Sequence, residues 1–200
     1  MTGWALGLLV VYLVLAFGVR VAVSLRTTGT TGIAGLAGAP RLELLGGGLF
    51  AAGVAAGVAS PLLVENGGLD PIDALHLPFL HATGFALVGL GIGGTFVAQM
   101  QMGTSWRIGV DESERTDLII GGLFSLIRNP IYTFMLVAWT GFALLVPTWL
   151  SLAAVLIGLA GLQIQVRLVE EPHMIRTHGE PYRAWAARVG RFLPGLGQLD

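Results

Sequence analysis

Hydrophobic residues along this chain gather in long blocks that are separated by short polar segments. Three of the blocks, residues 3–25, 44–64 and 77–97, are each long enough to cross the roughly 30 Å hydrocarbon core of a bilayer as a helix. Arg20 lies near the end of the first block, where a long cationic side chain can extend to the interface. The pattern therefore predicts three transmembrane helices in the first half of the chain.

Two shorter apolar runs follow, residues 131–146 and 149–166, and only Pro147 and Thr148 separate them. Pro130 stands at the first position of the first run, where the missing N–H of proline costs a helix nothing. The two runs predict a tight helical hairpin, slightly short for a bilayer, which indicates an indented membrane boundary. The fold class predicted is an all-α integral membrane protein with five transmembrane helices.

Composition agrees with a membrane location. Hydrophobic residues make up 54% of the 200 residues and charged residues only 12%, whereas soluble domains carry about 25% charged residues. The formal net charge is −1, and no continuous basic face is offered to phosphates, so nucleic-acid binding is not expected. The chain contains no cysteine, which excludes thiolate nucleophiles and cysteine-based metal sites.

Arginines mark the connections that should face the cytoplasm. They surround the first and third connections and the C-terminal tail, but the second connection, near Glu65, Asp70 and Asp73, has none. By the positive-inside rule, the N-terminus is outside and the C-terminus is cytoplasmic. The arginines concerned are Arg20, Arg26, Arg41, Arg107, Arg115, Arg128, Arg176, Arg183, Arg188 and Arg191.

The tail after the fifth apolar run has the pattern of an interfacial helix. Pro181 stands at a helix start, Tyr182, Trp185 and Val189 share one face, and Gly190 follows as a stop signal. Such a helix would lie at the cytoplasmic membrane surface with its aromatic face toward the lipid.

Two adjacent carboxylates, Glu170 and Glu171, follow the fifth run directly. They are either a solvated helix end or, if Pro172 opens a new helix, acidic groups at its favourable N-terminus. Glu170 and His173 also form one Glu-x-x-His unit, which di-iron bundles use twice together with further glutamates. Because only one copy is present, no metal site is predicted.

A second polar group stands at the entrance of the hairpin, in the segment Arg128-Asn129-Pro130-Ile131-Tyr132. It is a candidate binding site, although positive-inside anchoring with an interfacial tyrosine would give the same pattern. Arg167 lies within or at the end of the fifth helix, where a charge is costly and needs a partner or a function. For Arg167, pairing with Glu170 or Glu171 and a functional role both remain open.

The order of the short motifs from residue 103 to residue 194 resembles the isoprenylcysteine carboxyl methyltransferase family and its phospholipid N-methyltransferase relatives. The first three helices resemble that family only in being membrane spans. The matching pieces are Met102-Gly103 with Ser105-Trp106, Gly122-x-Phe124, Arg128-x-Pro130-x-Tyr132, Glu170-Glu171, Gly179-x-x-Tyr182-x-x-Trp185 and Gly190-Arg191-Phe192-Leu193-Pro194.

The resemblance implies an S-adenosylmethionine-dependent methyltransferase whose pocket opens to the cytosol. It divides the chain into a three-helix transmembrane region, 1–102, and a catalytic region, 103–200. Arg128 and Arg167 would face the acidic group of the substrate or the cofactor carboxylate. Asn129 stands where the family usually has histidine, and an amide cannot be protonated. The cofactor would contact Asn129, Pro130, Tyr132, Glu170, Glu171, His178 and Tyr182.

The function expected from this resemblance is methyl transfer to a lipophilic or lipidated acceptor at the cytoplasmic membrane face, with carboxyl O-methylation as the first choice. A carboxylate nucleophile needs no general base, so catalysis would rest on positioning and desolvation. N-methylation of a lipid amine is the close alternative and would need a base or a deprotonated amine. An NADPH-dependent sterol-reductase-like protein and a non-catalytic membrane scaffold are less favoured interpretations of the same pattern.

Overall fold

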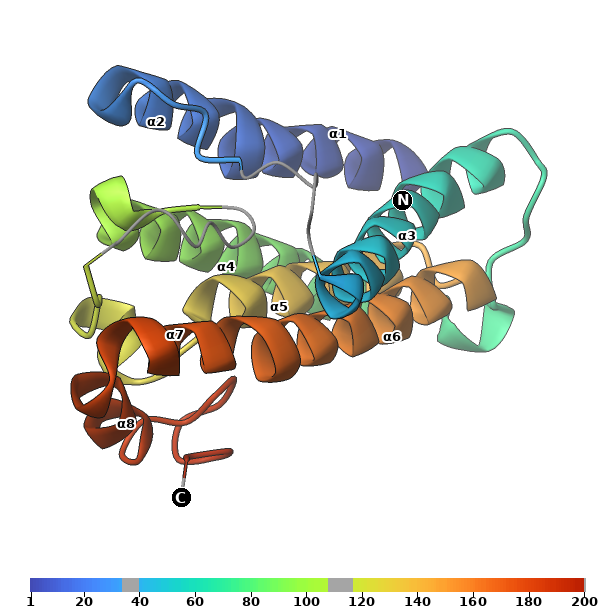
Figure 1. Cartoon of the computed structure of the whole chain (residues 1–200). Helices are drawn as coiled ribbons and strands as arrows, with labels where there is room; N and C mark the ends of the chain where they lie inside the picture. The colour runs from blue at the N-terminus through green and yellow to red at the C-terminus, as the bar shows by residue number, and fades with distance from the viewer. Residues whose placement is uncertain (34–39, 108–116, 200) are drawn as a thin grey trace.

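The computed structural model describes residues 1–33, 40–107 and 117–199, so Arg115 lies outside the described residues. Within these ranges the chain is mostly helical, and two isolated β-bridges, Ile127 with Gly190 and Leu193 with Leu196, involve the C-terminal segment. Figure 1 shows most of the long helices as rods that run along one another, with the helix of residues 41–65 crossing them and the C-terminal segment folded against one end of the bundle.

The elements follow in chain order. The first rod consists of α1 (Thr2–Leu13), a π-helical turn (Val14–Val19) and α2 (Arg20–Thr28). It is followed by α3 (Arg41–Glu65), a 3₁₀ turn (Asp73–Leu75), α4 (Pro78–Met102) and two more 3₁₀ turns, Gly103–Ser105 and Gly122–Ser125. The remaining elements are α5 (Pro130–Leu145), α6 (Trp149–Ile164), a second π-helical turn (Gln165–Glu170), α7 (Glu171–His178) and α8 (Glu180–Ala186).

All five predicted apolar segments are helical. Among the described residues, four helical rods are long and apolar enough to cross a membrane, Thr2–Thr28, Arg41–Glu65, Pro78–Ser105 and Trp149–His178. The shorter apolar helix is α5, with 16 residues. The chain is thus an integral membrane protein with an all-helical fold, as predicted.

The fifth segment differs from the prediction. Its helix does not end near residue 166 but continues through the π-helical turn to His178, so only α5 of the predicted hairpin is short. Pro172 does not open a separate helix, because it falls in the first turn of α7 within a continuous rod. A π-helical turn changes the hydrogen-bond register, so a proline directly after it interrupts the rod less than one inside a regular α-helix. Glu170 and Glu171 therefore lie along the rod.

Small residues allow the helices to approach closely. A Cβ added at Gly91 of α4 would lie 2.4 Å from the backbone nitrogen of Ala138 in α5, and one at Gly53 of α3 would lie 2.9 Å from the carbonyl oxygen of Ala154 in α6. Backbones can approach in this way only where no side chain intervenes. Gly46 also lies at such a backbone contact and Gly94 lies against the Phe134 side chain, whereas Gly47, Gly48, Gly89 and Gly93 have open space around them.

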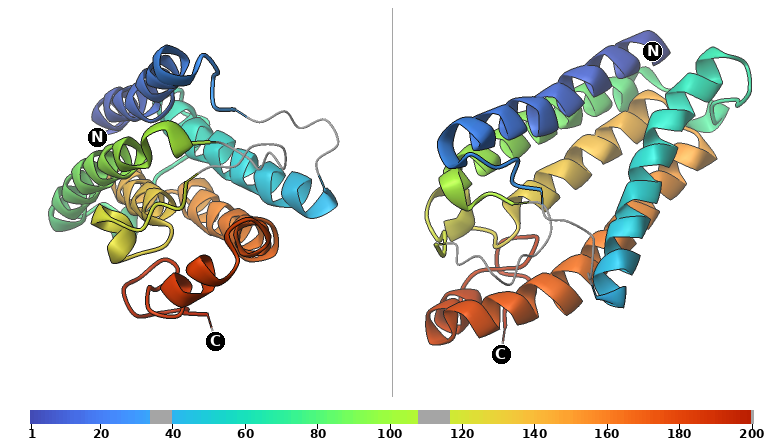
Figure 2. Two further views of the ribbon diagram at one scale, coloured as in Figure 1. Left: turned by 60° about the vertical axis from the view of Figure 1, so that its left-hand side comes forward. Right: turned by 45° about the horizontal axis from the view of Figure 1, so that its top comes forward.

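Arg20 does not extend to the interface as the sequence suggested. Its side chain is buried, its guanidinium lies 4.9 Å from the centre of the Trp106 ring, and it donates a hydrogen bond to the carbonyl of Gly103. The first rod is thereby attached to the segment that follows α4. In the two views of Figure 2, α1 runs beside α4, while α3 crosses α6 and diverges from the first rod toward the α2 end.

The C-terminal segment packs on protein rather than presenting its apolar face to lipid. Tyr182, Trp185, Ala186 and Val189 form one buried cluster with Phe124 of the 3₁₀ turn before α5. The backbone N–H groups of Arg128 and Asn129 then donate to the carbonyls of Gly190 and Arg191, at 2.8 and 3.1 Å. The predicted face is correct, but its partner is the loop that leads into α5.

Candidate active site

A cavity of about 630 Å³ lies between the helices at the end of the bundle where the C-terminal segment docks. Its walls come from the first rod, α3, α4, the start of α5, the second π-helical turn, α7 and α8. Volumes of this size are typical of small-molecule and cofactor sites. Most of the site residues predicted from the sequence line it, namely Arg128, Asn129, Pro130, Tyr132, Glu170, Glu171 and Tyr182.

Glu171 holds two arginines at the floor of this cavity. One carboxylate oxygen accepts from Arg128 at 2.6 Å and from Arg191 Nε at 2.7 Å, and the other accepts from an Arg191 amino group at 2.9 Å. Glu171 is only 5% exposed. The hydrogen bond from Arg191 to Glu171 outweighs burial and raises the pKa of Arg191. The carboxylate is therefore a structural centre that joins α7 to the tail.

The Arg128 side chain holds the C-terminal tail in place through its hydrogen bonds. One of its terminal amino groups donates to the carbonyls of Ala186 and Val189, both at 2.7 Å, and the other donates to Glu171 and to the carbonyl of Gly197 at 2.9 Å. The residue is 4% exposed. Because both terminal groups are occupied, Arg128 is poorly placed to hold the acidic substrate group that the sequence suggested for it.

Asn129 occupies the position of the family histidine at the beginning of α5. Its side-chain amide donates to the carbonyl of Arg191 at 3.1 Å, the same carbonyl that accepts from its backbone N–H. Thr133, one turn on, donates to the carbonyl of Phe192 at 2.8 Å. The amide thus fixes the tail on the first turn of α5, a task that requires a donor and no ionisable group.

Glu170 and Tyr132 form a second polar pair that belongs to the cavity rather than to the tail. The Tyr132 hydroxyl donates to a Glu170 carboxylate oxygen at 2.6 Å, and the Gln165 side chain also hydrogen-bonds to Glu170. Neither of these partners is a cation. Glu43, from the start of α3, adds a third carboxylate to the cavity wall.

Aromatic side chains close the cavity at the α8 side. The rings of Tyr182 and Trp185 meet edge to face with centroids 5.6 Å apart. Burial, together with the negative charge of Glu171, raises the pKa of Tyr182 to about 12, so its hydroxyl stays protonated and available as a donor. The indole N–H of Trp185 is buried and has no partner among the described residues.

Two predicted site residues lie away from the cavity. Arg167 is exposed on the second π-helical turn, without a partner among the described residues, and His178 lies at the end of α7 and does not line the cavity. The structure therefore pairs Arg167 with neither Glu170 nor Glu171. His173 does line the cavity, but no group of three or more histidine, aspartate or glutamate side chains in the described ranges is placed to hold a metal ion.

Several lining residues come from the first half of the chain and were not predicted. Glu43 and Gln99 are the clearest, together with Phe17 of the first π-helical turn, whereas Trp106, which also lines the cavity, belongs to one of the motifs of the resemblance. Glu43 and Gln99 stand at the edges of apolar blocks, where a polar residue is the ordinary sign of an interface, and Phe17 lies inside the first block. The sequence offered no signal that distinguishes them from anchors. The cavity thus draws on both regions into which the chain was divided, and that division stays a prediction.

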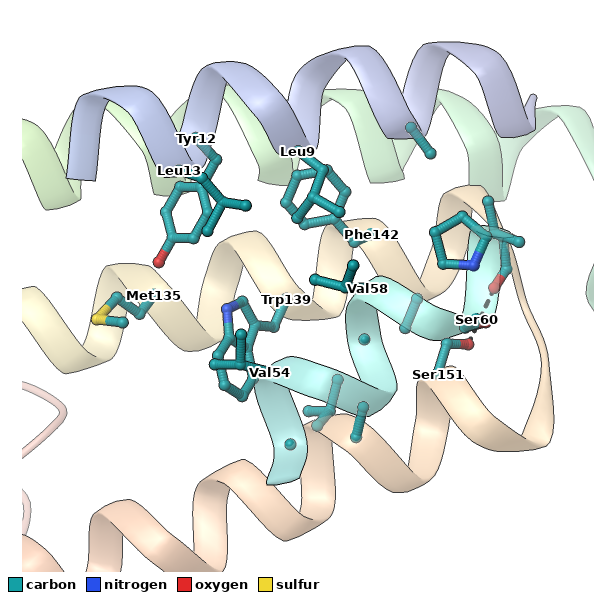
Figure 3. A pocket seen from close by; sticks show the side chains of 18 of the residues that line it. Leu9, Tyr12, Leu13, Val54, Val58, Ser60, Met135, Trp139, Phe142 and Ser151 are labelled. Atoms are coloured by element: carbon teal, nitrogen blue, oxygen red, sulfur yellow. Dashed lines mark hydrogen bonds between the residues drawn. The ribbon is translucent and has the colours of Figure 1, made fainter. Parts of the chain in front are cut away.

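A second, smaller cavity of about 50 Å³ continues into the bundle, between α1, α3, α5 and α6. Figure 3 shows Leu9, Tyr12, Val54, Trp139 and Phe142 around it, with Ser60 and Ser151 at the far end. Its lining is almost entirely apolar. Phe17 and Met135 line both cavities, so the main cavity at the end of the bundle adjoins a smaller apolar cleft between the helices.

Comparison with known families agrees with this arrangement. The model of the phospholipid methyltransferase family matches residues 79–181, which is just over half of the chain. The chain belongs to the phospholipid methyltransferase family. The match begins in α4, earlier than the motifs of the sequence indicated, and includes the hairpin, the double glutamate and the start of α8. No curated protein matches the chain significantly.

The fold has a solved counterpart. The structure of the eukaryotic intramembrane Ras methyltransferase, isoprenylcysteine carboxyl methyltransferase, superimposes with a TM-score of 0.62 at 17% sequence identity, and the match covers 90% of this chain. The chain spans 62% of the length of that protein. At this identity the likeness establishes a common fold, and the membership of the methyltransferase family rests on the sequence match.

Proposed function

We propose that the protein transfers a methyl group from S-adenosylmethionine to a lipophilic acceptor at the cytoplasmic face of the membrane. The observation that carries the proposal is the cavity itself, because a chamber with four carboxylate residues in a largely apolar wall adjoins an apolar cleft between the membrane-spanning helices. A polar cofactor from water and a lipid from the bilayer can meet only at such a boundary.

The chemistry of the chamber fits this cofactor, which when bound supplies an electrophilic methyl group on a sulfonium centre. Carboxylates such as Glu43 and Glu170 suit its two cationic groups, and the aromatic wall suits a purine ring. The unpaired buried N–H of Trp185 and the unpaired side-chain oxygen of Gln165 would each gain a partner. An NADPH 2′-phosphate would instead meet four carboxylate residues and two arginines, Arg107 and Arg128, and both terminal groups of Arg128 are occupied.

The acceptor that the chamber favours is a lipid amine. Carboxyl O-methylation, the first choice from the sequence, relied on Arg128 and Arg167, but the first is committed to the tail and the second lies outside the cavity. A carboxylate acceptor would approach the like charge of Glu170 without the help of either arginine. A neutral amine attacks with its lone pair as the carbon–sulfur bond breaks, and the proton that it then loses can pass to the Glu170 carboxylate.

The cofactor assignment is tested by calorimetry on the purified protein in lipid nanodiscs. S-adenosylmethionine is expected to bind at least about tenfold more tightly than NADPH, roughly 1.4 kcal/mol. Methyl transfer from labelled cofactor is then measured with dodecylamine and with dodecanoic acid as acceptors, and the amine is expected to be labelled faster. Tighter binding of NADPH would refute the methyltransferase proposal, and faster labelling of the acid would refute only the choice of acceptor.

We also propose the N-outside, C-cytoplasmic orientation, which follows from the arginine-free second connection. Because the chain has no cysteine, single cysteines can be placed without background. Asn66, exposed after α3, and Ala184, exposed on α8, are suitable positions. An impermeant maleimide is expected to label Asn66→Cys from outside sealed cells and Ala184→Cys only after permeabilisation. Labelling of both from the same side would contradict the five-span topology.

A further inference from the structure

Gln99 is a polar residue of α4 that the proposed chemistry has not used. It is 4% exposed and lines the main cavity. Its side-chain nitrogen donates to the carbonyl of Ala16 at 3.0 Å. Ala16 lies in the first π-helical turn, Val14–Val19. Gln99 thus joins α4 to this turn of the neighbouring rod.

This contact fixes which way the amide faces. A backbone carbonyl can only accept, so the nitrogen of Gln99 must point toward Ala16 and the oxygen must point away from it. That oxygen is buried and has no partner among the described residues. A buried acceptor without a partner is costly and rare in native proteins, so a donor belonging to a ligand is the natural partner for an acceptor that lines a cavity.

The position of Gln99 tells which part of a ligand would meet it. Phe17, the residue after Ala16, lines both the main cavity and the apolar cleft, as does Met135. Gln99 therefore offers an acceptor close to the passage between the two spaces. The polar head of an amphiphile at this point would have its hydrocarbon tail along the largely apolar wall of the main cavity, because the cleft of about 50 Å³ is too small for an alkyl chain. Glu170 and Tyr132 reach the cavity from other elements, the second π-helical turn and α5.

We propose that the Gln99 side-chain oxygen accepts a hydrogen bond from an N–H group of the methyl acceptor, and that it thereby limits the number of methyl groups transferred. The inference rests on the proposed function. A neutral primary or secondary amine can donate one N–H to Gln99 while its lone pair attacks the methyl group. A neutral tertiary amine has a lone pair but no N–H, and its protonated form has an N–H but no lone pair. Methylation of the tertiary amine accordingly lacks this hydrogen bond and is slower than the first two methyl transfers.

The wild-type protein tests the limit directly. Dodecylamine and N-methyldodecylamine are expected to be converted to N,N-dimethyldodecylamine, with the product identified by mass spectrometry. N,N-dimethyldodecylamine offered as the acceptor should react at least about tenfold more slowly, consistent with the loss of one buried hydrogen bond. Ready formation of the quaternary trimethyl product would overturn the proposal.

The residue assignment is tested with Gln99→Leu, which removes the acceptor at similar volume. Its KM for N-methyldodecylamine is expected to rise about five- to tenfold, while its affinity for S-adenosylmethionine stays within about threefold. Thr95→Val is the matched control, because Thr95 lies one turn earlier on α4, is 1% exposed and also has an unpaired hydroxyl, but does not line the cavity. An equal rise in KM in both variants would assign the effect to packing and contradict the proposal.

A binding measurement separates this inference from the proposed function. The protein is photo-crosslinked to a diazirine-bearing alkyl amine, and 1-dodecanol and dodecyl methyl ether are each added as competitors of this probe. Of the two competitors, only the alcohol carries a hydrogen-bond donor. The wild type is expected to prefer the alcohol by about fivefold, and Gln99→Leu to show no preference. If no amine is methylated but this preference is present, the proposed function fails and the Gln99 contact stands. The absence of any preference in the wild type would refute the contact.

Discussion

Replacing Glu171 with alanine is expected to release the C-terminal segment from the bundle. The carboxylate is the shared partner of Arg128 and Arg191, and the side chain of Arg128 is 1% exposed. Removing one partner of a buried ion pair leaves an uncompensated charge, which costs about 3–5 kcal/mol. The sequence motif predicts a cofactor contact for this residue, so that the alanine variant would lose binding and still fold. The geometry indicates that tail docking and cofactor binding are lost together.

Limited proteolysis and amide hydrogen exchange measure the release. In Glu171→Ala, residues 186–199 are expected to exchange and to be cleaved rapidly, whereas α4 and α5 keep the protection of the wild type. Glu180→Ala is the control, because Glu180 is an exposed carboxylate only nine positions further along the chain. Wild-type protection of the tail in Glu171→Ala, combined with lost binding of S-adenosylmethionine, would favour a cofactor role for Glu171 over a structural one.

Replacing Glu170 with glutamine is expected to have the largest effect on turnover. Glutamine keeps the size of the side chain and can still accept a hydrogen bond from Tyr132, but it cannot take up a proton. General base catalysis contributes typically about 10²- to 10⁴-fold, so methyl transfer to dodecylamine should fall at least about 100-fold. The affinity for S-adenosylmethionine should stay within about threefold. Tyr132→Phe leaves the carboxylate without its phenol donor and should have a smaller effect, about tenfold.

Both quantities are measured on the same purified sample, turnover with labelled cofactor and affinity by calorimetry. Thr140→Val is the control on α5, because Thr140 is exposed and its hydroxyl bonds only to the carbonyl of Leu136 in the same helix. A large loss of cofactor affinity in Glu170→Gln would assign Glu170 to the cofactor, as its place in the double glutamate suggested. Turnover within about threefold of the wild type would exclude it as the base.

The rod that begins at Trp149 extends further than its hydrophobicity predicts. The apolar pattern places its end near residue 166, because the polar residues from Arg167 onward resemble the end of a span. The helix nevertheless continues to His178. Hydrophobic periodicity indicates which residues avoid water. It does not indicate whether a helix continues beyond the membrane, because that depends on packing against the tail.

Arg128 and Arg167 carry the same charge in similar sequence surroundings, at the edge of an apolar helix, yet their environments differ. The first is buried by four hydrogen-bond acceptors that are 43 to 69 positions away in the chain, and the second is exposed. A difference that depends on partners so distant in sequence has no local signature.

The sequence by itself determined the membrane location, the five apolar helices, the hairpin, the buried face of the tail and the family, because each depends on local hydrophobicity or on short motifs in order. Only the tertiary structure decided that Glu171 joins the tail to α7, that Glu170 faces the cavity with Tyr132, and that Gln99 turns an unpaired oxygen into it. These roles depend on side chains from separate helices that meet at one end of the bundle. Their meeting is fixed by helix crossing and π-helical turns, which leave no periodic trace in the sequence.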